Sequence, residues 1–212
     1  MGDHKNPGFQ NPRSVIKKVL ARPQHEGFET VTYMLEGAFT HQDFAGHKGT
    51  VRAGDLQGKD VSRVEKHGVD VRIIAGESFG VRSPVYTQTP TMYLDFTLHP
   101  GAEVHQHIPP PWNSFVYIIE GEGVFGDPNA SPTTRHHALV LSPGDGLSMW
   151  NRAARPLRFV LIGGQPLNEP IVQYGPFVMN AQAEIQQALD DYHYCKNGFE
   201  KAKNWKSQPH MN

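Results

Sequence analysis

Two histidines separated by a single residue, His105 and His107, have the side-chain type and the spacing to bind a metal ion. Side chains at positions i and i+2 of an extended segment point to the same side, so the two imidazoles could chelate one cation. A stable site takes three or four ligands. The adjacent His136 and His137 would project to opposite faces of a strand, so at most one of them could be a further ligand. His105 and His107 are therefore candidate metal ligands, but the preferred interpretation is a pair of loop histidines before a proline turn that bind no metal.

The strands on either side of these histidines are predicted from hydrophobic periodicity. Apolar and polar residues alternate through the segment 91–98, and a period of two is typical of a strand. Residues 115–119, Phe-Val-Tyr-Ile-Ile, favour a strand that is covered on both faces. The turn sequences Pro100-Gly101 and Glu-Gly-Glu-Gly (120–123) follow these two strands. This spacing of strands and turns predicts a compact all-β domain.

The remainder of the chain adds further strands and one helix. The expected strands lie at 13–21, 28–35, 38–41, 50–52, 69–76, 138–141, 157–162 and 169–180. The stretch 58–68 is polar and charged, and no element is predicted there. A helix is expected to begin near Asn180 as its N-cap and to stop at Asn197-Gly198. Its apolar stripe consists of Ile185, Ala188, Leu189 and Tyr192.

The composition argues against several classes of function. The 212 residues carry a formal net charge of −1, with a pI near 6.9, so nothing favours direct binding of nucleic acid or of an acidic membrane surface. The only cysteine of the sequence, Cys195, allows no intrachain disulfide. The segment 1–12 is polar and no apolar stretch has the length of a membrane span. We therefore expect neither a secretory signal nor a transmembrane segment.

Several longer segments resemble the pirin family, and the plant pirin-like proteins most of all. The resemblance rests on the segments 27–33, 54–57, 86–95, 175–180 and 196–200 and extends over nearly the whole chain. It implies a bicupin, in which an N-terminal β-barrel holds a single iron and a C-terminal β-barrel holds no metal. It also implies a protein of the nucleus and the cytoplasm. Some pirins oxidise quercetin as 2,3-dioxygenases, others are redox-sensitive transcriptional cofactors, and plant members are linked to G-protein signalling.

The iron ligands of the pirin family have no counterparts in this chain. The family carries His-Pro-His-Arg directly before the strand Gly-Phe-Glu-Thr-Val, where this chain has Arg-Pro-Gln-His-Glu at 22–26. After Gly-Asp-Leu-Gln (54–57) the family continues with Trp-Met-Thr-Ala-Gly and a His-x-Glu pair. This chain continues with Gly-Lys-Asp at 58–60 and rejoins the family near Gly68. By this resemblance two internal stretches of the N-terminal cupin are missing, together with all four expected ligands. We expect no catalytic residue, no iron and no other cofactor in this chain.

The segment 85–126 also resembles the metal-binding pattern of cupin barrels. That pattern is Pro-Gly, His-x-His, a glutamate, a glycine-bounded turn and a later histidine. The glutamate is absent, because Ile-Pro-Pro-Pro-Trp stands at 108–112, and Met149 and Trp150 occupy the place of the later histidine. Of this pattern, the two histidines His105 and His107 are present.

These observations predict an all-β, bicupin-like fold with a C-terminal helix. We expect a truncated N-terminal cupin domain at 1–68, a C-terminal cupin domain at 69–180, and the helix and tail at 181–212. The preferred function is a pirin-like regulatory or interaction protein of the nucleus and cytoplasm, with protein partners and no contact with nucleic acid or membrane. An iron-dependent dioxygenase of the quercetin 2,3-dioxygenase type is the first alternative, and a cupin that binds metal through His105 and His107 is the second. The missing strands would leave the first barrel with unpaired edges, which favours disorder, dimerisation or aggregation.

Overall fold

A computed structural model of the chain describes residues 14–19, 29–34, 38–42, 48–52, 61–87, 89–175, 177–201 and 204. The chain divides into two compact units. The first unit comprises Met1–Lys59 together with Glu169–Asn212, and the second unit is Asp60–Asn168. The sequence predicted domain boundaries after residues 68 and 180, which differ from the limits of these two units. Those domain boundaries remain a prediction.

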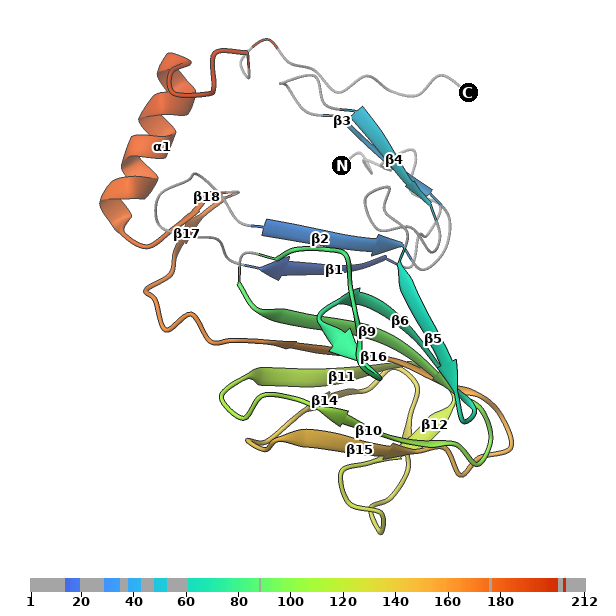
Figure 1. Cartoon of the computed structure of the whole chain (residues 1–212). Coiled ribbons are helices and arrows are strands. Elements are labelled where there is room, and N and C mark those ends of the chain that lie inside the picture. Colours follow the sequence, from blue (N-terminus) through green and yellow to red (C-terminus); the bar gives the residue numbers. More distant parts are fainter. Residues whose placement is uncertain are drawn as a thin grey trace, which may run out of the picture. The chain divides into compact units, whose positions relative to one another are not determined.

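The second unit consists of two antiparallel sheets and a short hairpin (Figure 1). The larger sheet has the order β14-β11-β16-β9-β6-β5, and the smaller sheet has the order β10-β15-β12-β13. The strands of the larger sheet are β5 (Ser62–Lys66), β6 (Val69–Ala75), β9 (Thr91–Leu98), β11 (Asn113–Glu120), β14 (Ala138–Val140) and β16 (Leu157–Gly164). Those of the smaller sheet are β10 (Glu103–His107), β12 (Glu122–Phe125), β13 (Thr133–Thr134) and β15 (Gly146–Trp150), and the hairpin consists of β7 (Glu77–Ser78) and β8 (Val81–Arg82).

The hydrophobic core of the second unit is built from the facing sides of its two sheets. Side chains alternate between the two faces of a strand, so every second residue of β6, β9 and β16 points into this core. The larger sheet contributes Val69, Val71, Ile73, Met92, Leu94, Phe96, Leu98, Val116, Ile118, Leu157, Phe159 and Leu161, and the smaller sheet contributes Val104, Leu147 and Met149. The rings of Phe96 and Phe159 stack with centroids 5.2 Å apart, and Phe125 meets Phe159 edge-on at 5.3 Å. Removal of this apolar surface from water, at about 25 cal/mol per Å², is the main term that stabilises the unit.

The opposite face of the larger sheet is also buried at its centre. Ile74, Val160 and Ile162 point away from the core between the sheets, and each is at most 1% exposed. Coverage on both faces was predicted for the segment 115–119, where Phe115 and Tyr117 prove to be half-buried. Burial of both faces is more complete in β9 and β16, the two central strands of the larger sheet.

The strands of the first unit form antiparallel pairs. β1 (Ser14–Val19) pairs with β2 (Glu29–Met34), β3 (Ala38–Gln42) with β4 (Lys48–Arg52), and β17 (Val172–Tyr174) with β18 (Phe177–Met179). Helix α1 (Gln182–Tyr194) contacts the β17–β18 hairpin. Among the described residues, α1 does not combine the length and apolar character needed to cross a bilayer. A mostly β architecture with a C-terminal helix confirms the predicted fold class.

Two predicted strand assignments were wrong. The polar stretch 58–68 contains β5, which pairs with β6 from Ser62 opposite Ile73 to Lys66 opposite Val69. Hydrophobic periodicity did not predict β5, because this strand lies at the edge of the sheet and has charged side chains at three of its five positions. The segment 169–180 is not one strand but the β17–β18 hairpin, which turns at Gly175 with φ +55°.

The predicted helix boundaries also need correction. The N-cap is Ala181 rather than Asn180. The Glu184 carboxylate accepts the backbone N–H of Ala181 at 2.8 Å and that of Asn180 at 3.1 Å, so an acidic side chain of the first turn binds the N-cap N–H and the one before it. The helix ends at Cys195, whose left-handed backbone (φ +55°) closes it two residues before the predicted stop. Of the predicted stripe, Ile185 and Ala188 are buried, whereas Tyr192 is 50% exposed.

Candidate functional site

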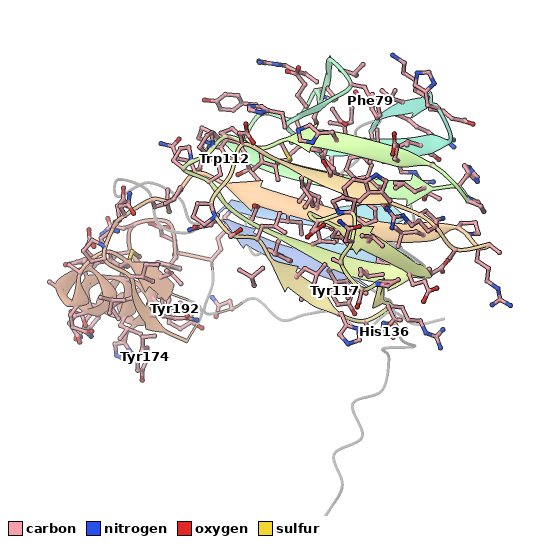
Figure 2. The ribbon with its side chains drawn as sticks, turned by 90° about the horizontal axis from the view of Figure 1, so that it is seen from below. Phe79, Trp112, Tyr117, His136, Tyr174 and Tyr192 are labelled. Carbon is pink, nitrogen blue, oxygen red and sulfur yellow. The ribbon has the colours of Figure 1, made fainter. Side chains whose placement is uncertain are left out.

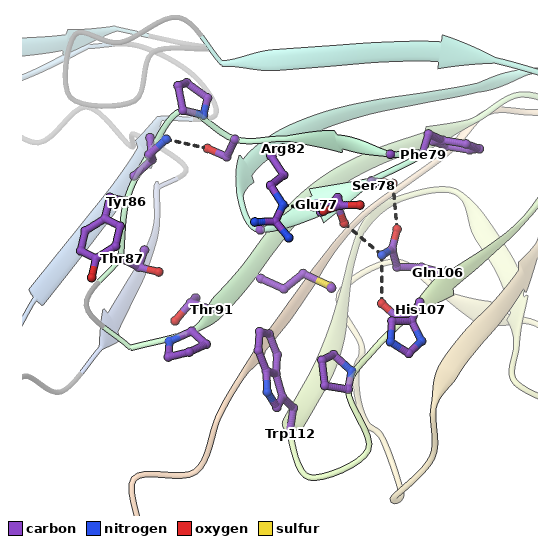
Figure 3. A pocket seen from close by; sticks show the side chains of 18 of the residues that line it. Glu77, Ser78, Phe79, Arg82, Tyr86, Thr87, Thr91, Gln106, His107 and Trp112 are labelled. Carbon is purple, nitrogen blue, oxygen red and sulfur yellow. Dashed lines mark hydrogen bonds and ion pairs between the residues drawn. The ribbon is translucent and has the colours of Figure 1, made fainter.

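A cavity of about 840 Å³ lies on the second unit beside the β7–β8 hairpin (Figure 3). Three segments line it: the hairpin with the chain that follows it, the start of β9, and β10 with the loop that leads to Trp112. This volume is within the range of small-molecule binding sites. The cavity is therefore the candidate functional site.

Gln106, the fourth of the five residues of β10, fixes the hairpin that forms one wall of the cavity. Its side chain is 6% exposed, and its Oε1 accepts a hydrogen bond from the Ser78 hydroxyl at 2.7 Å. Its Nε2 donates to the backbone carbonyls of Glu77 at 3.1 Å and His107 at 3.0 Å. A buried amide needs such partners, and these bonds engage its oxygen and both of its protons. Gln106 therefore shapes the cavity by holding β7 against β10.

An ion pair from the hairpin faces the same space. Arg82 donates from Nε to Oε2 of Glu77 at 2.7 Å, and the two side chains are 84% and 45% exposed. An ion pair this exposed contributes little to stability. Because both side chains are exposed, their charges are accessible to a ligand. Figure 3 shows the Arg82 guanidinium beside Glu77, on the side of the cavity opposite Trp112.

Apolar and aromatic side chains form the other wall. Met92 is 5% exposed and belongs to the core, and Trp112 is half-buried and packs against that core. The Trp112 backbone N–H donates to the Pro109 carbonyl at 3.0 Å, which closes the turn that presents the indole. Phe79 and Tyr86 add rings that are 39% and 81% exposed. The cavity thus combines a flat apolar wall with one cationic side chain.

His105 and His107 both border this cavity and lie on the exposed face of β10. The Nδ1 of His105 is 2.9 Å from the Ser148 hydroxyl on β15. Gly146 gives the His105 ring its room, because a Cβ at that position would lie 2.7 Å from Nε2. Among the described residues, no three His, Cys, Asp or Glu side chains are grouped to hold a metal ion. The metal-binding role of the two histidines remains a prediction.

His136 and His137 lie in a turn rather than in a strand. His136 has a positive φ of +67°, and the Nδ1 of His137 is 3.0 Å from the Thr134 carbonyl. Figure 2 shows His136 and Trp112 at well-separated positions of the second unit. The structure therefore does not bring this pair together with the histidines of β10.

The positions that would complete a cupin metal site in the second unit carry apolar side chains. Ile108 is 4% exposed and Met149 is fully buried, and both belong to the hydrophobic core. Trp150 points elsewhere and donates from Nε1 to the Glu103 carboxylate at 2.9 Å. The interior of this barrel does not fit a metal ion, which requires charged or polar ligands.

A second polar cluster lies on the outward face of the larger sheet. Asp95, 3% exposed, accepts two hydrogen bonds from Arg158, at 3.1 and 2.8 Å, and Arg72 lies 4.0 Å from the same carboxylate. Arg63 binds Asp70 through two donors, and this hydrogen bonding raises the pKa of the Arg63 guanidinium above its ordinary value. These pairs join neighbouring strands, and we assign them to the stability of the sheet.

No motif of the sequence indicates the cavity. Its lining comes from segments up to 36 positions apart, from Gly76 to Trp112, and no motif joins them. The one available signal was Gln106, an inward-pointing polar residue between two histidines in an alternating strand. A polar residue at a core-facing position indicates a specific hydrogen-bonding partner, which here is the β7–β8 hairpin.

Two facing antiparallel sheets with a filled interior define a cupin-type barrel, and the comparisons with known proteins agree. The sequence model of the Pirin C-terminal cupin domain matches residues 93–198, and the Pirin model matches residues 1–60. A pirin-like protein of Solanum lycopersicum is 46% identical, with 94% of this chain and 98% of that protein covered. Pirin of Homo sapiens is 40% identical, with 87% of this chain and 79% of that protein covered. This chain belongs to the pirin family.

A solved structure agrees with this assignment. Quercetin 2,3-dioxygenase of Acinetobacter baumannii superposes with a TM-score of 0.70 at 27% identity, covering 87% of this chain and 78% of that one. The alignment with the tomato protein extends over 285 residues, more than the 212 residues of this chain. That alignment must therefore place residues of the tomato protein opposite gaps in this chain.

Proposed function

We propose that this protein is a regulatory or interaction member of the pirin family that has lost the iron site of its N-terminal cupin. The contrast between its two halves carries the proposal. The second unit has a complete core between two sheets and matches the C-terminal cupin domain of pirins. In the N-terminal half, by the resemblance to the family, the two stretches that would carry the four expected ligands are missing.

The sequence around the expected ligands supports the loss of iron. Arg-Pro-Gln-His-Glu (22–26) replaces a segment with two histidines, and Gly-Lys-Asp (58–60) stands where the family continues toward a His-x-Glu pair. The gaps required by the 285-residue alignment agree with two missing stretches. An iron site needs its ligands held together on a closed barrel, so removal of two ligand-bearing stretches would abolish it.

A binding role follows from what remains. The C-terminal cupin offers a folded surface and a cavity of about 840 Å³. The net charge of −1 gives no general attraction to nucleic acid or to acidic membranes. Membership of the pirin family supports protein partners of the transcription or G-protein signalling type, which we propose for this chain. We propose the nucleus and the cytoplasm as its location, which a fluorescent fusion can test.

The alternative is an iron-dependent quercetin 2,3-dioxygenase. The likeness to the Acinetobacter enzyme of that name, at 27% identity and a TM-score of 0.70, favours it. Iron would supply the oxygen chemistry of that reaction. The described residues provide no ligand group for the metal, and the barrel of the second unit is filled with apolar side chains.

Metal content and quercetin turnover separate the two functions. The protein would be expressed in iron-supplemented medium, analysed by inductively coupled plasma mass spectrometry, and assayed for oxygen uptake with quercetin. The Acinetobacter enzyme serves as the positive control for the assay. A matched variant would carry the residues of the tomato protein that face gaps in this chain. We expect iron in the restored variant and none in this chain, whereas near-stoichiometric iron with quercetin turnover in this chain would overturn the proposal.

A further inference from the structure

We propose that the cavity beside the β7–β8 hairpin binds a small aromatic carboxylate. The described lining of the cavity belongs to the second unit alone, so binding there does not depend on the iron content of the N-terminal half. Some polar groups of the cavity wall are already bonded within the protein, and the others remain available to a ligand.

Most polar side chains of the wall are engaged within the protein. Ser78 donates to Gln106, and the amide of Gln106 is fully bonded. Ser83 donates to the Ile74 carbonyl at 2.8 Å and accepts the backbone N–H of Val85 at 3.1 Å. Thr91 donates to the Thr89 carbonyl at 2.9 Å. These groups keep the wall rigid and offer little further hydrogen bonding.

The groups that remain are mainly donors. Arg82 uses only its Nε toward Glu77, and its two terminal nitrogens form no hydrogen bond with the described residues. The ring of His107 has no hydrogen-bond partner among those residues, whereas the Nδ1 of His105 is 2.9 Å from the Ser148 hydroxyl. A guanidinium with two free donors matches a carboxylate, which accepts both bonds at once. An acceptor-rich, negatively charged ligand group therefore fits this side of the cavity.

The opposite side selects a flat apolar body. Trp112 and Met92 provide an indole face and a thioether, both anchored against the core. Aromatic ligands stack on such surfaces at low entropic cost, because the side chains are already held in place. An aromatic ring at Trp112 with its carboxylate at Arg82 would use both walls. Glu77 is the single acidic side chain in the described lining, and it weakens this preference by neutralising Arg82.

Substitutions of the two partners of the Arg82–Glu77 ion pair should change the affinity for the ligand in opposite directions. The probe is 2-naphthoate, the uncharged comparison is 2-naphthylmethanol, and binding is measured by isothermal titration calorimetry with the full chain. Arg82→Gln should weaken 2-naphthoate binding about tenfold or more, because it removes a charge-assisted bidentate contact. Glu77→Gln should strengthen it, because it removes the competing carboxylate. Arg152→Gln is the matched control, since Arg152 lies outside the cavity and contacts the Trp150 ring and the Pro128 carbonyl.

The possible outcomes are distinct. Stronger binding by Glu77→Gln together with weaker binding by Arg82→Gln supports the proposal, because a distorted hairpin would weaken binding in both variants. Trp112→Leu should weaken the binding of both naphthyl compounds, which would place the naphthyl ring against the Trp112 indole. Equal affinity for 2-naphthoate and 2-naphthylmethanol, absence of 2-naphthoate binding, or weakening by both hairpin variants would overturn it.

Discussion

At the scale of single residues, Asp95 is the most constrained acidic side chain that the structure describes. It is 3% exposed and holds Arg158 through two hydrogen bonds, on a strand at the centre of the larger sheet. Breaking a buried ion pair is costly because the remaining charge keeps its desolvation penalty. The Arg158 side chain is 24% exposed, so water can compensate for part of the loss.

We expect Asp95→Asn to lower the free energy of unfolding by about 2–4 kcal/mol. Urea denaturation followed by circular dichroism would measure it. Asp70→Asn is the matched control, because Asp70 pairs with Arg63, whose side chain is 55% exposed, on the same sheet. The control should lose far less stability, and an equal loss in the two variants would contradict the assigned role of burial.

The sequence predicted which side chains share a face of a strand, but it did not predict which distant residues surround them. The alternation in 91–98 correctly placed Met92, Leu94 and Phe96 on one face. It could not indicate that Tyr93 and Asp95, on the other face, are also buried, because that depends on residues distant in the chain. For the same reason, the spacing of His105 and His107 predicted a shared face but not that Ser148 would lie beside one ring.

At the scale of elements, the turn between β11 and β12 depends on a glycine. Gly121 has φ +76°, and a Cβ there would lie 2.4 Å from the Pro156 carbonyl oxygen. Gly126, after β12, has a nearly equal φ of +78° but no atom within 4 Å of its Cβ position. The two positions therefore share the conformational requirement and differ in steric contact.

Alanine at these two glycines separates conformational strain from overlap. Gly126→Ala should cost about 1 kcal/mol, because an alanine is forced into the left-handed region. Gly121→Ala should cost about 3 kcal/mol or more, since backbone atoms that cannot rotate away must also shift. Thermal unfolding of both variants gives the difference. Similar losses would show that the Pro156 segment moves freely.

Element prediction succeeded where a segment has its own hydrophobic period and failed at edges. β9 was recognised because apolar and polar residues alternate along it, which makes its inner face uniformly apolar. β5 was missed because it is an edge strand, stabilised by pairing with β6 and by one half-buried apolar side chain, Val64. The β17–β18 hairpin was read as a single strand because both of its arms are apolar and extended.

At the scale of the whole molecule, stability should follow the order of strands in the larger sheet. β9 and β16 are paired on both sides, whereas β5 and β14 lie at the edges. An amide exchanges with solvent only when its hydrogen bond opens, and central strands open only in large unfolding events. The order of exchange thus reports which strands form the core of the protein.

We expect amides of β9 and β16 to exchange at least about 100-fold more slowly than those of β5, a difference of about 2.7 kcal/mol in opening free energy. Hydrogen–deuterium exchange with mass spectrometry at low protein concentration would measure it. The same experiment tests whether the β5 edge of the larger sheet pairs with a second copy of the chain. Protection of β5 that increases with protein concentration would indicate that a second copy pairs with this edge. Protection equal to that of β9 at every concentration would contradict the assignment of β5 as an edge, because an amide at a free edge opens without unfolding of the sheet.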